Sequence, residues 1–304
     1  MNNIVIHRSK LIIDKLSGTM PVTNEEDKAR IIENMLREGG FQARRGLYGI
    51  VLTRMLDSEA VGYSVVDDKT KKTLLRIECN PRSPNNNFFR FEFNPSKISL
   101  TEFNELFTDI TGMKFEHALE VSNLTRVDFA VDLTGISMNE LAVTYGKHTI
   151  TRNILEKGIT RYIGSGKANT QLCAYDKKEE SKFANEQRIP ELGEPTYHEK
   201  TRIELRLRRS VVNNLNSLYE LDNPFQTVNL YQVSRVKELK ETNIKTILAL
   251  LPYKGLHGVL TGVSPYYRRK VRDALEDCKL ACWQPDDIWS ELGDALRDLF
   301  DYTA

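Results

Sequence analysis

The chain has 304 residues, of which 40% are hydrophobic and 28% are charged, a balance that predicts a soluble globular protein with one large domain or two moderate ones. The formal net charge is +1, which excludes a globally basic protein that coats DNA, so nucleic-acid binding would need local clusters of arginine and lysine. The sequence shows no apolar run that approaches a membrane span, and its start, MNNIVIHRSK, has no signal-peptide core. We therefore expect a cytoplasmic protein that contacts no membrane.

The cysteine and histidine patterns do not fit a thiolate or imidazole metal site. The four cysteines show no CxxC spacing, which predicts reduced and mostly buried thiols. The five histidines show neither His-x-His nor HExxH spacing. Carboxylates would have to hold any metal ion, and this ligand type favours Mg²⁺ or Mn²⁺.

The first 134 residues predict mainly strands, with two helices between them. Asn24 can cap a helix that Gly39 and Gly40 end. Ser99 and Glu102 form a capping-box pattern for a second helix, to about residue 111. The expected strands lie within 3–22 and at 48–52, 62–66, 73–79, 88–93 and 123–134.

The next part of the chain centres on a predicted hairpin. Ser137 and Glu140 form a second capping-box pattern, which predicts a short helix that ends at Gly146. A polar turn at 164–170 separates two strands at 160–163 and 171–175. The expected elements after the hairpin are a loop at 182–197, a strand at 200–209 and a helix at 210–218.

Helical periodicity replaces strand alternation beyond about residue 222. Ser264 and Pro265 begin a helix, and its apolar stripe consists of Tyr267, Val271, Leu275 and Cys278. Residues 285–300 form the last expected helix. We therefore expect two domains, an α+β domain at 1–221 and a helical C-terminal module at 222–304.

Four expected strands repeat an arginine two residues before a carboxylate. The pairs are Arg76 with Glu78, Arg90 with Glu92, Arg126 with Asp128 and Arg202 with Glu204. Because strand side chains alternate between faces, each pair points to one side while Phe91, Val127, Leu205 and similar residues point to the other. This pattern predicts an α+β fold whose antiparallel sheet has one charged face and helices on the other.

The charged face has two interpretations. Asp132, Arg206 and Arg208 extend it, and a face of carboxylates that ligate a metal and arginines that hold phosphate oxygens suits phosphodiester chemistry. Cross-strand salt bridges on a solvated face would give the same pattern.

Tyr175 ends the second strand of the hairpin, and Asp176, Lys177, Lys178 and two glutamates follow at once. A phenol in this setting can act as a nucleophile, because lysines stabilise phenolate and phosphate charge. The alternative is an ordinary strand tyrosine ahead of a solvated run of charges.

Taken in order, four segments resemble the replication initiation factor family, which includes rolling-circle plasmid initiators, filamentous-phage initiators and relaxases of integrative elements. The segments are FRFEFNPSKIS at 89–99, LTRVDFAVDL at 124–133, TRYIGSGKANTQLCAYDKKEE at 160–180 and TRIELRLRR at 201–209. The resemblance is loose before about residue 75, and beyond about residue 220 it extends only to helical character.

The resemblance implies a site-specific DNA nickase that rejoins the strand it cuts. It aligns Tyr175 with a nucleophile that leaves a 5′-phosphotyrosine link and a free 3′-hydroxyl primer, beside Lys177 and Lys178. The carboxylates that it implies for Mg²⁺ or Mn²⁺ are Asp128, Asp132 and Glu204, with Glu92 as a fourth candidate. The expected partners are origin DNA, single-stranded or extruded, together with a host helicase and a second copy of the chain.

Two positions depart from the family pattern. Cys173 stands where the family often has an arginine, and Gly166 and Lys167 follow Ser165 where the family turn often reads GSR. Lys167 is therefore a candidate for a phosphate contact that has moved. The side chains that we expect to contact DNA are Arg90, Arg126, Lys167, Arg202, Arg206, Arg208, Arg268 and Arg272.

The helix after Ser264 is the candidate reader of origin sequence. Catalytic strands hold phosphates but read little sequence, whereas arginines such as Arg268 and Arg272 on a helix can read guanine in a major groove. A surface helix with solvated charges is the alternative, since the same helix carries acidic residues. Two other functions stay open: a relaxase of a mobile element with the same chemistry, and a non-catalytic origin-binding protein of the same fold.

Overall fold

The computed structural model describes residues 6–39, 48–54, 61–67, 73–79, 89–95, 100–155, 158–177, 199–208, 211–238 and 240–299. The chain divides into two compact units, each built from separate stretches of sequence. Unit 1 comprises Met1–Ile12, Ala130–Arg206 and Asp222–Leu292. Unit 2 comprises Ile13–Phe129, Leu207–Leu221 and Gly293–Ala304.

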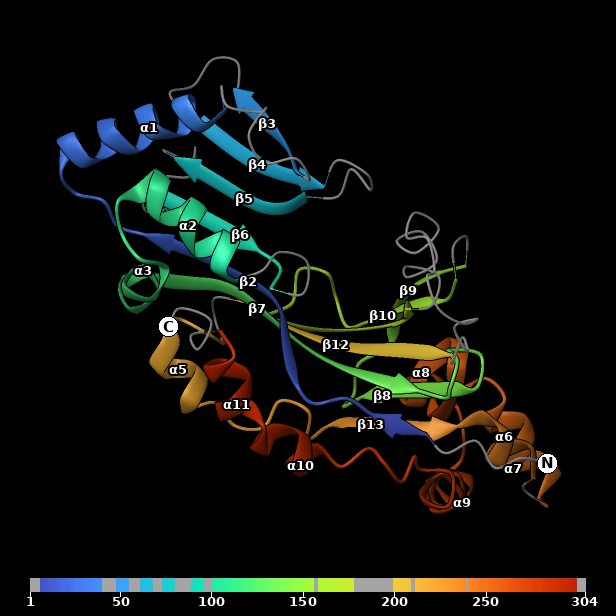
Figure 1. Cartoon of the computed structure of the whole chain (residues 1–304). Coiled ribbons are helices and arrows are strands. Elements are labelled where there is room, and N and C mark those ends of the chain that lie inside the picture. Colours follow the sequence, from blue (N-terminus) through green and yellow to red (C-terminus); the bar gives the residue numbers. More distant parts are fainter. Residues whose placement is uncertain are drawn as a thin grey trace, which may run out of the picture. The chain divides into compact units, whose positions relative to one another are not determined.

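Antiparallel strands and surrounding helices make up the fold (Figure 1), which confirms the α+β class. The strands are β1 (His7–Arg8), β2 (Ile12–Met20), β3 (Tyr48–Arg54), β4 (Val61–Asp67), β5 (Thr73–Cys79), β6 (Phe89–Phe93), β7 (Asn123–Thr134), β8 (Leu141–Tyr145), β9 (Ile150–Ile154), β10 (Thr160–Ile163), β11 (Thr170–Asp176), β12 (Lys200–Arg208) and β13 (Val228–Gln232). The helices are α1 (Glu25–Gly39), α2 (Leu100–Thr111), α3 (Phe115–Val121), α5 (Leu215–Tyr219), α6 (Val233–Glu238), α7 (Thr242–Leu248), α8 (Leu251–Leu260), α9 (Pro265–Glu276), α10 (Pro285–Ser290) and α11 (Leu292–Arg297).

In unit 2, helices cover the apolar face of a sheet with the strand order β3-β4-β5-β6-β2-β7 (Figure 1). The predicted alternation is confirmed on β6, where Phe89, Phe91 and Phe93 are fully buried. The ring of Phe89 meets Phe107 of α2 edge-on at 5.6 Å, and that of Phe91 meets Phe115 of α3 edge-on at 5.4 Å. These aromatic contacts fix the two helices on the sheet, because each ring buries a large apolar area in a specific orientation.

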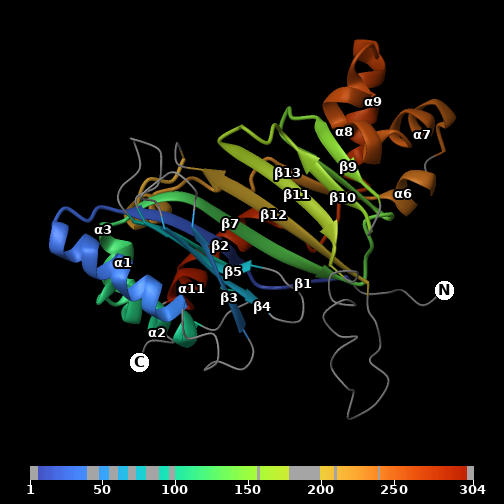
Figure 2. The same ribbon diagram turned by 90° about the horizontal axis from the view of Figure 1, so that it is seen from above.

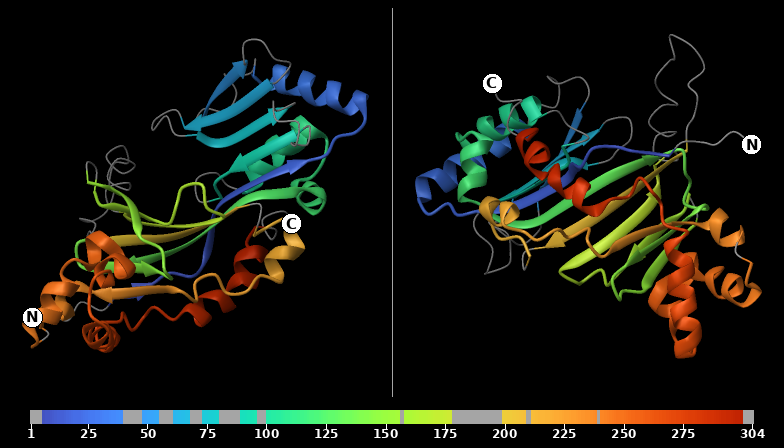
Figure 3. Two further views of the ribbon diagram at one scale, coloured as in Figure 1. Left: turned by 180° about the vertical axis from the view of Figure 1, so that it is seen from behind. Right: turned by 90° about the horizontal axis from the view of Figure 1, so that it is seen from below.

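Unit 1 contains the strand order β7-β12-β11-β10-β9, with β1 paired to β7 and a separate two-stranded sheet of β8 and β13. The helices α7, α8 and α9 gather beside these strands (Figures 2 and 3), where they share an apolar core with β8 and β13. Residues Asp222–Leu292 therefore fold together with Ala130–Arg206. A functional division at residue 222 stays a prediction.

The helix predicted after Ser137 is wrong. The backbone N–H and hydroxyl of Ser137 donate to the Glu140 carboxylate at 3.2 and 3.1 Å, but this contact closes a turn. The next residues, Leu141–Tyr145, form the buried strand β8 and pair antiparallel with β13. Branched and aromatic side chains with a strand partner outweigh the capping signal. The strand β13 itself lies where we expected strand alternation to have ended.

Four further elements differ from the prediction or were missed. The helix expected at 210–218 begins only at Leu215, because Asn214 provides the N-cap by accepting from Ser217 N–H at 2.8 Å. The segment of the last expected helix forms two helices, α10 and α11. Helix α3 and strand β9 were not predicted. Ser99 and the expected loop at 182–197 lie outside the described residues. In the described part of the chain, every helix is too short or too polar to cross a membrane.

Gly18 is required where β2 crosses the aromatic cluster. It pairs with Phe91 across the β2–β6 ladder, and an added Cβ would lie 2.5 Å from Phe91 Cζ. We predict that Gly18→Ala lowers the free energy of unfolding by about 1–3 kcal/mol, because the ring is held by its aromatic neighbours and must move. Urea denaturation measures the change.

Gly293→Ala is the matched control, because an added Cβ there meets no atom within 4 Å. It should leave stability unchanged or raise it slightly, since alanine favours a helix over glycine. Equal stability of Gly18→Ala and the wild-type protein would show that the ring of Phe91 moves aside without cost.

Candidate active site

The predicted hairpin is confirmed and places Tyr175 near the end of β11. Strands β10 and β11 pair antiparallel, with Thr160 opposite Tyr175 and Tyr162 opposite Cys173. Gly164 opens the turn between them in the left-handed region, with φ of 88°, a conformation that costs glycine little. Tyr175 is half-buried, so the strand fixes its backbone while part of the residue stays at the surface.

Tyr175 lies on the charged face of the unit 1 sheet. Residues two apart on a strand share a face, as do residues directly opposite each other on paired strands. Tyr175 therefore shares its face with Cys173 and Tyr162. The guanidinium of Arg206 on β12 lies over the Tyr162 ring, 5.5 Å from its centroid, and its Nε donates to Glu204 at 2.6 Å. The candidate nucleophile and these two β12 side chains thus occupy one side of neighbouring strands.

Asp132 is the centre of a cation cluster on the same sheet. Arg202 donates to its two carboxylate oxygens at 2.6 and 3.0 Å. Lys177, two residues after Tyr175, donates to Oδ2 at 2.9 Å, and Lys200 Nζ lies 3.1 Å from the same oxygen. Among the described residues, one carboxylate thus contacts three cations, two from β12 and one from the residue that follows β11. The excess positive charge makes this cluster suited to an anion such as phosphate.

The cluster lowers the pKa of two of its members, Asp132 and Lys177. Burial alone would raise the pKa of Asp132, but the hydrogen bonds and charges of Arg202 and Lys177 outweigh it and hold the pKa far below its usual value. Burial, followed by the positive charge of Arg202, lowers the pKa of Lys177, although Asp132 opposes that change. Asp132 is therefore ionised throughout the physiological range.

The candidate carboxylates of unit 2 are also paired with cations. Asp128 is 1% exposed and accepts from Arg126 at both oxygens, with Nε at 2.7 Å from Oδ1. Glu92 lies 2.5 Å from Lys15 Nζ. Burial would raise the pKa of Glu92, but the hydrogen bond and charge of Lys15 lower it.

The predicted carboxylates do not form a metal-binding group in this structure. Within the described ranges, no cluster of three or more His, Cys, Asp or Glu residues is placed to hold an ion. Instead Asp128, Asp132 and Glu204 each accept from arginine, and the cations occupy the oxygens that a metal would need. As folded, these carboxylates pair with arginines, and a divalent ion on them stays a prediction.

The structure separates the predicted DNA-contacting residues by their exposure. Arg202 is buried, Arg90, Arg126, Arg206 and Arg208 are half-buried, and Lys167, Arg268 and Arg272 are exposed. Lys178 lies outside the described residues.

Lys200 is the residue of the cluster that sequence reasoning missed. It shares the strand parity of Arg202, and this spacing was the available signal. Tyr162 was missed as well, because an aromatic residue on a short strand gives no sign of a cation above its ring.

Comparisons with known proteins leave the family undetermined. No family model and no curated protein matches the chain. Among solved structures, the chain is similar to a rolling-circle replication initiator protein from Geobacillus stearothermophilus, with 13% identity, a TM-score of 0.35 and coverage of 90% of this chain and 97% of that one. A similarity at this level does not bear on function.

We predict that Asp132→Asn lowers the free energy of unfolding by about 3–5 kcal/mol, because it leaves the buried guanidinium of Arg202 without its countercharge. The folded-state pKa of Asp132 is lowered from 3.8, so its stabilisation is complete above that pH and is lost as the pH falls towards the folded-state value. The variant should lose this part of the acid dependence, which urea denaturation between pH 2 and pH 7 measures.

Glu120→Gln removes a carboxylate at an exposed position of α3 and is the control, with an expected change within about 0.5 kcal/mol. A similarly small effect of Asp132→Asn would contradict the central position of Asp132 in the cluster.

Proposed function

We propose that the protein initiates rolling-circle DNA replication by cutting and rejoining one DNA strand, with Tyr175 as the nucleophile. The main support is that Tyr175 shares a sheet face with charged β12 side chains. It also lies two residues before Lys177, a member of the Asp132 cluster. The four ordered sequence segments supply the resemblance to replication initiators. Neither observation depends on the solved structure to which the chain is similar.

The cation cluster would hold the scissile phosphate. Asp132 orients Lys177, Lys200 and Arg202 and neutralises one of their charges, which leaves charge to attract a phosphodiester. The two lysines are partly exposed, at 22% and 38% of their side chains, whereas Arg202 is buried. The lysines would therefore contact the phosphate, and Arg202 would hold Asp132 in place behind them.

The chemical step would be a transesterification. The phenol oxygen of Tyr175 forms a bond to phosphorus as the bond between phosphorus and the 3′-oxygen breaks. The phenol loses one proton and the 3′-oxygen gains one, so the products are a 5′-phosphotyrosine and a free 3′-hydroxyl. Lys177 would stabilise the phenolate as it forms. Attack by a 3′-hydroxyl on the phosphotyrosine reverses the step and closes the strand. The 5′ polarity follows from the family resemblance.

A metal requirement stays a prediction. A divalent ion would polarise the scissile phosphate, and the sequence suggests Mg²⁺ or Mn²⁺ on Asp128, Asp132, Glu204 or Glu92. These side chains would first have to exchange the cations that they now contact.

The relaxase and the non-catalytic origin-binding protein are the alternative functions. A relaxase uses the same chemistry in another genetic setting, so the genes beside the coding sequence separate it from an initiator. The pairing of every candidate carboxylate with a cation favours a non-catalytic protein over a metal-dependent enzyme. The measurement of nicking described next decides between catalysis and its absence.

Tyr175→Phe should lower nicking by at least about 10³-fold while folding and DNA affinity stay nearly unchanged, because only the phenol oxygen is lost. The measurement is relaxation of a supercoiled plasmid that carries the coding sequence with its flanking DNA, in the presence of Mn²⁺. Tyr219→Phe, at an exposed position, is the control and should nick at the wild-type rate. Wild-type nicking by Tyr175→Phe would place the nucleophile elsewhere.

Asp128→Ala and Glu204→Ala test the metal prediction through the dependence of the nicking rate on Mn²⁺ concentration. If these carboxylates bind an ion, both variants should lose metal-dependent cleavage. Circular dichroism and urea denaturation check that each variant folds, since both side chains are buried. A folded variant with an unchanged Mn²⁺ response would assign its carboxylate to ion pairing with Arg126 or Arg206 alone.

A further inference from the structure

Helix α8 is interrupted at Gly255, where φ is 67°, and its last part forms a helix-turn-helix arrangement with α9. Four residues, 261–264, connect them, and Gly262 in this turn adopts the left-handed conformation with φ of 79°. The turn is closed by Val263 N–H, which donates to the Leu260 carbonyl at 3.2 Å, and by Arg268 Nε, which donates to the Val263 carbonyl at 2.7 Å. Two helices joined by a short turn that contains glycine are typical of DNA-binding proteins, where the second helix enters the major groove.

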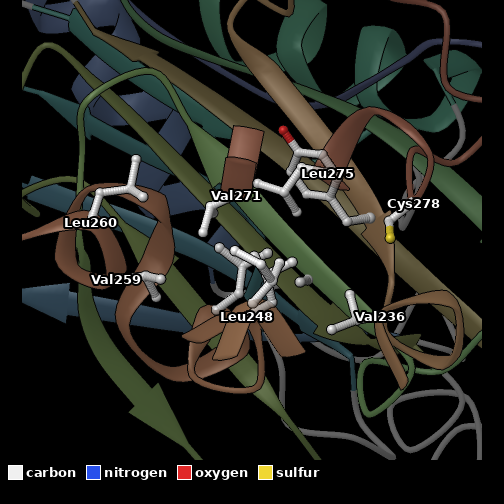
Figure 4. Packing of buried hydrophobic residues seen from close by; sticks show 11 residues of the cluster. Val236, Leu248, Val259, Leu260, Val271, Leu275 and Cys278 are labelled. Carbon is white, nitrogen blue, oxygen red and sulfur yellow. The ribbon is translucent and has the colours of Figure 1, made fainter. Parts of the chain in front are cut away.

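One face of α9 packs against the rest of unit 1, and the opposite face is exposed. Val271 and Leu275 are buried and belong to the same cluster as Leu248 of α7 and Leu260 of α8 (Figure 4). On the other side of the helix, Tyr266 is 62% exposed, and Arg269 and Arg272 are also exposed. The helix is thus held rigidly while it presents polar residues outward.

The charges of α9 run against the helix dipole. The first eight residues contain Arg268, Arg269, Lys270 and Arg272 and no acid, whereas the last four contain Asp273 and Glu276 and no base. A helix is stabilised by acids near its N-terminus and by bases near its C-terminus. Helix stability therefore does not explain this order of charges. The order does suit a polyanion that approaches the N-terminal part of α9.

In the described part of the chain, two of the four cations of α9 contact other protein groups and two do not. Arg268 holds the turn, as described above. Lys270 contacts Glu241, at the start of α7, at 2.9 Å, and lies 5.1 Å from the centroid of the Tyr266 ring. For Arg269 and Arg272, no ion pair or side-chain hydrogen bond is made within the described part of the chain. Both arginines lie among the first eight residues of α9 and are exposed.

We propose that α8, the turn and α9 bind duplex DNA, with α9 as the recognition helix in the major groove and Arg269 and Arg272 as its base-reading or phosphate-binding side chains. The acidic C-terminal half would then point away from the phosphates. This assignment refines the sequence prediction, because Arg268 moves from the reading face to the turn. The inference rests on the proposed function only in naming the replication origin as the duplex that is bound.

The test uses the full chain and selection from a library of random duplex oligonucleotides. The wild-type protein should enrich a defined sequence. Arg269→Ala combined with Arg272→Ala should bind that sequence at least about 30-fold more weakly at matched salt, because each lost arginine contact to a base is worth a large discrimination. Fluorescence anisotropy of the labelled duplex measures both affinities.

The charge-matched control is Lys245→Ala combined with Lys279→Ala, which removes two exposed cations of the same unit outside α9. Its affinity should stay within about threefold of the wild-type value, as expected for a small loss of nonspecific attraction. Equal affinity of the two double variants, or no enriched sequence with the wild-type protein, would overturn the proposal. Selective binding of an acidic protein in place of duplex DNA would overturn it as well.

Nicking of single-stranded DNA separates this inference from the proposed function. The Arg269 and Arg272 double variant should cut an exposed single strand at the wild-type rate, because neither arginine belongs to the Tyr175 face. If the wild-type protein enriches a duplex sequence but never nicks DNA, the recognition helix stands and the proposed catalytic function falls.

Discussion

The contact of Asp132 with Arg202, Lys177 and Lys200 determines the charged face of unit 1. Burying a guanidinium is costly unless a countercharge and good hydrogen bonds compensate, and Arg202 is almost fully buried. Asp132 supplies that countercharge from β7, and it also reaches the lysine that follows β11. The same carboxylate therefore stabilises the sheet and orders the residues next to Tyr175.

This arrangement links the stability of the sheet to the chemistry that we propose. A cluster with more cations than carboxylates is unfavourable by itself, and an incoming phosphate would relieve the repulsion among the cations. The lowered pKa of Lys177 has the same origin, since burial and Arg202 both disfavour its charged form. Phosphate binding should therefore strengthen the protonated state of Lys177 at the moment when the phenolate of Tyr175 needs a neighbouring positive charge.

Local sequence patterns predicted the elements that position the face. The hairpin of β10 and β11 was predictable because glycine and polar residues separate two strand-forming runs, and alternation predicted that Phe91 would be buried beside exposed charges. The segment 141–145 was not predictable in the same way, because a real contact between Ser137 and Glu140 mimicked a helix start. What decides its conformation is β13, a partner that lies more than 80 residues later in the chain.

The ion pairs and the burial of the candidate site residues were harder to predict from the sequence than their positions on the strands. Spacing correctly placed Arg126 beside Asp128 on one strand. However, it gave no reason to pair Arg202 with Asp132, because this contact joins two strands 70 residues apart. Burial of the carboxylates was also hidden, since a charged face seen from one strand alone suggests solvent. For these reasons the sequence did not reveal the ion pairs that these carboxylates make, and a metal site on them stays a prediction.

Direct identification of the covalent intermediate tests the central claim that Tyr175 attacks a phosphate. The protein is incubated with the supercoiled plasmid that carries its coding sequence, digested with a nuclease and a protease, and analysed by mass spectrometry. The account predicts a peptide that carries a nucleotide 5′-phosphate on Tyr175. Cleaved DNA with the nucleotide on any other residue, or with no covalent adduct, would contradict it.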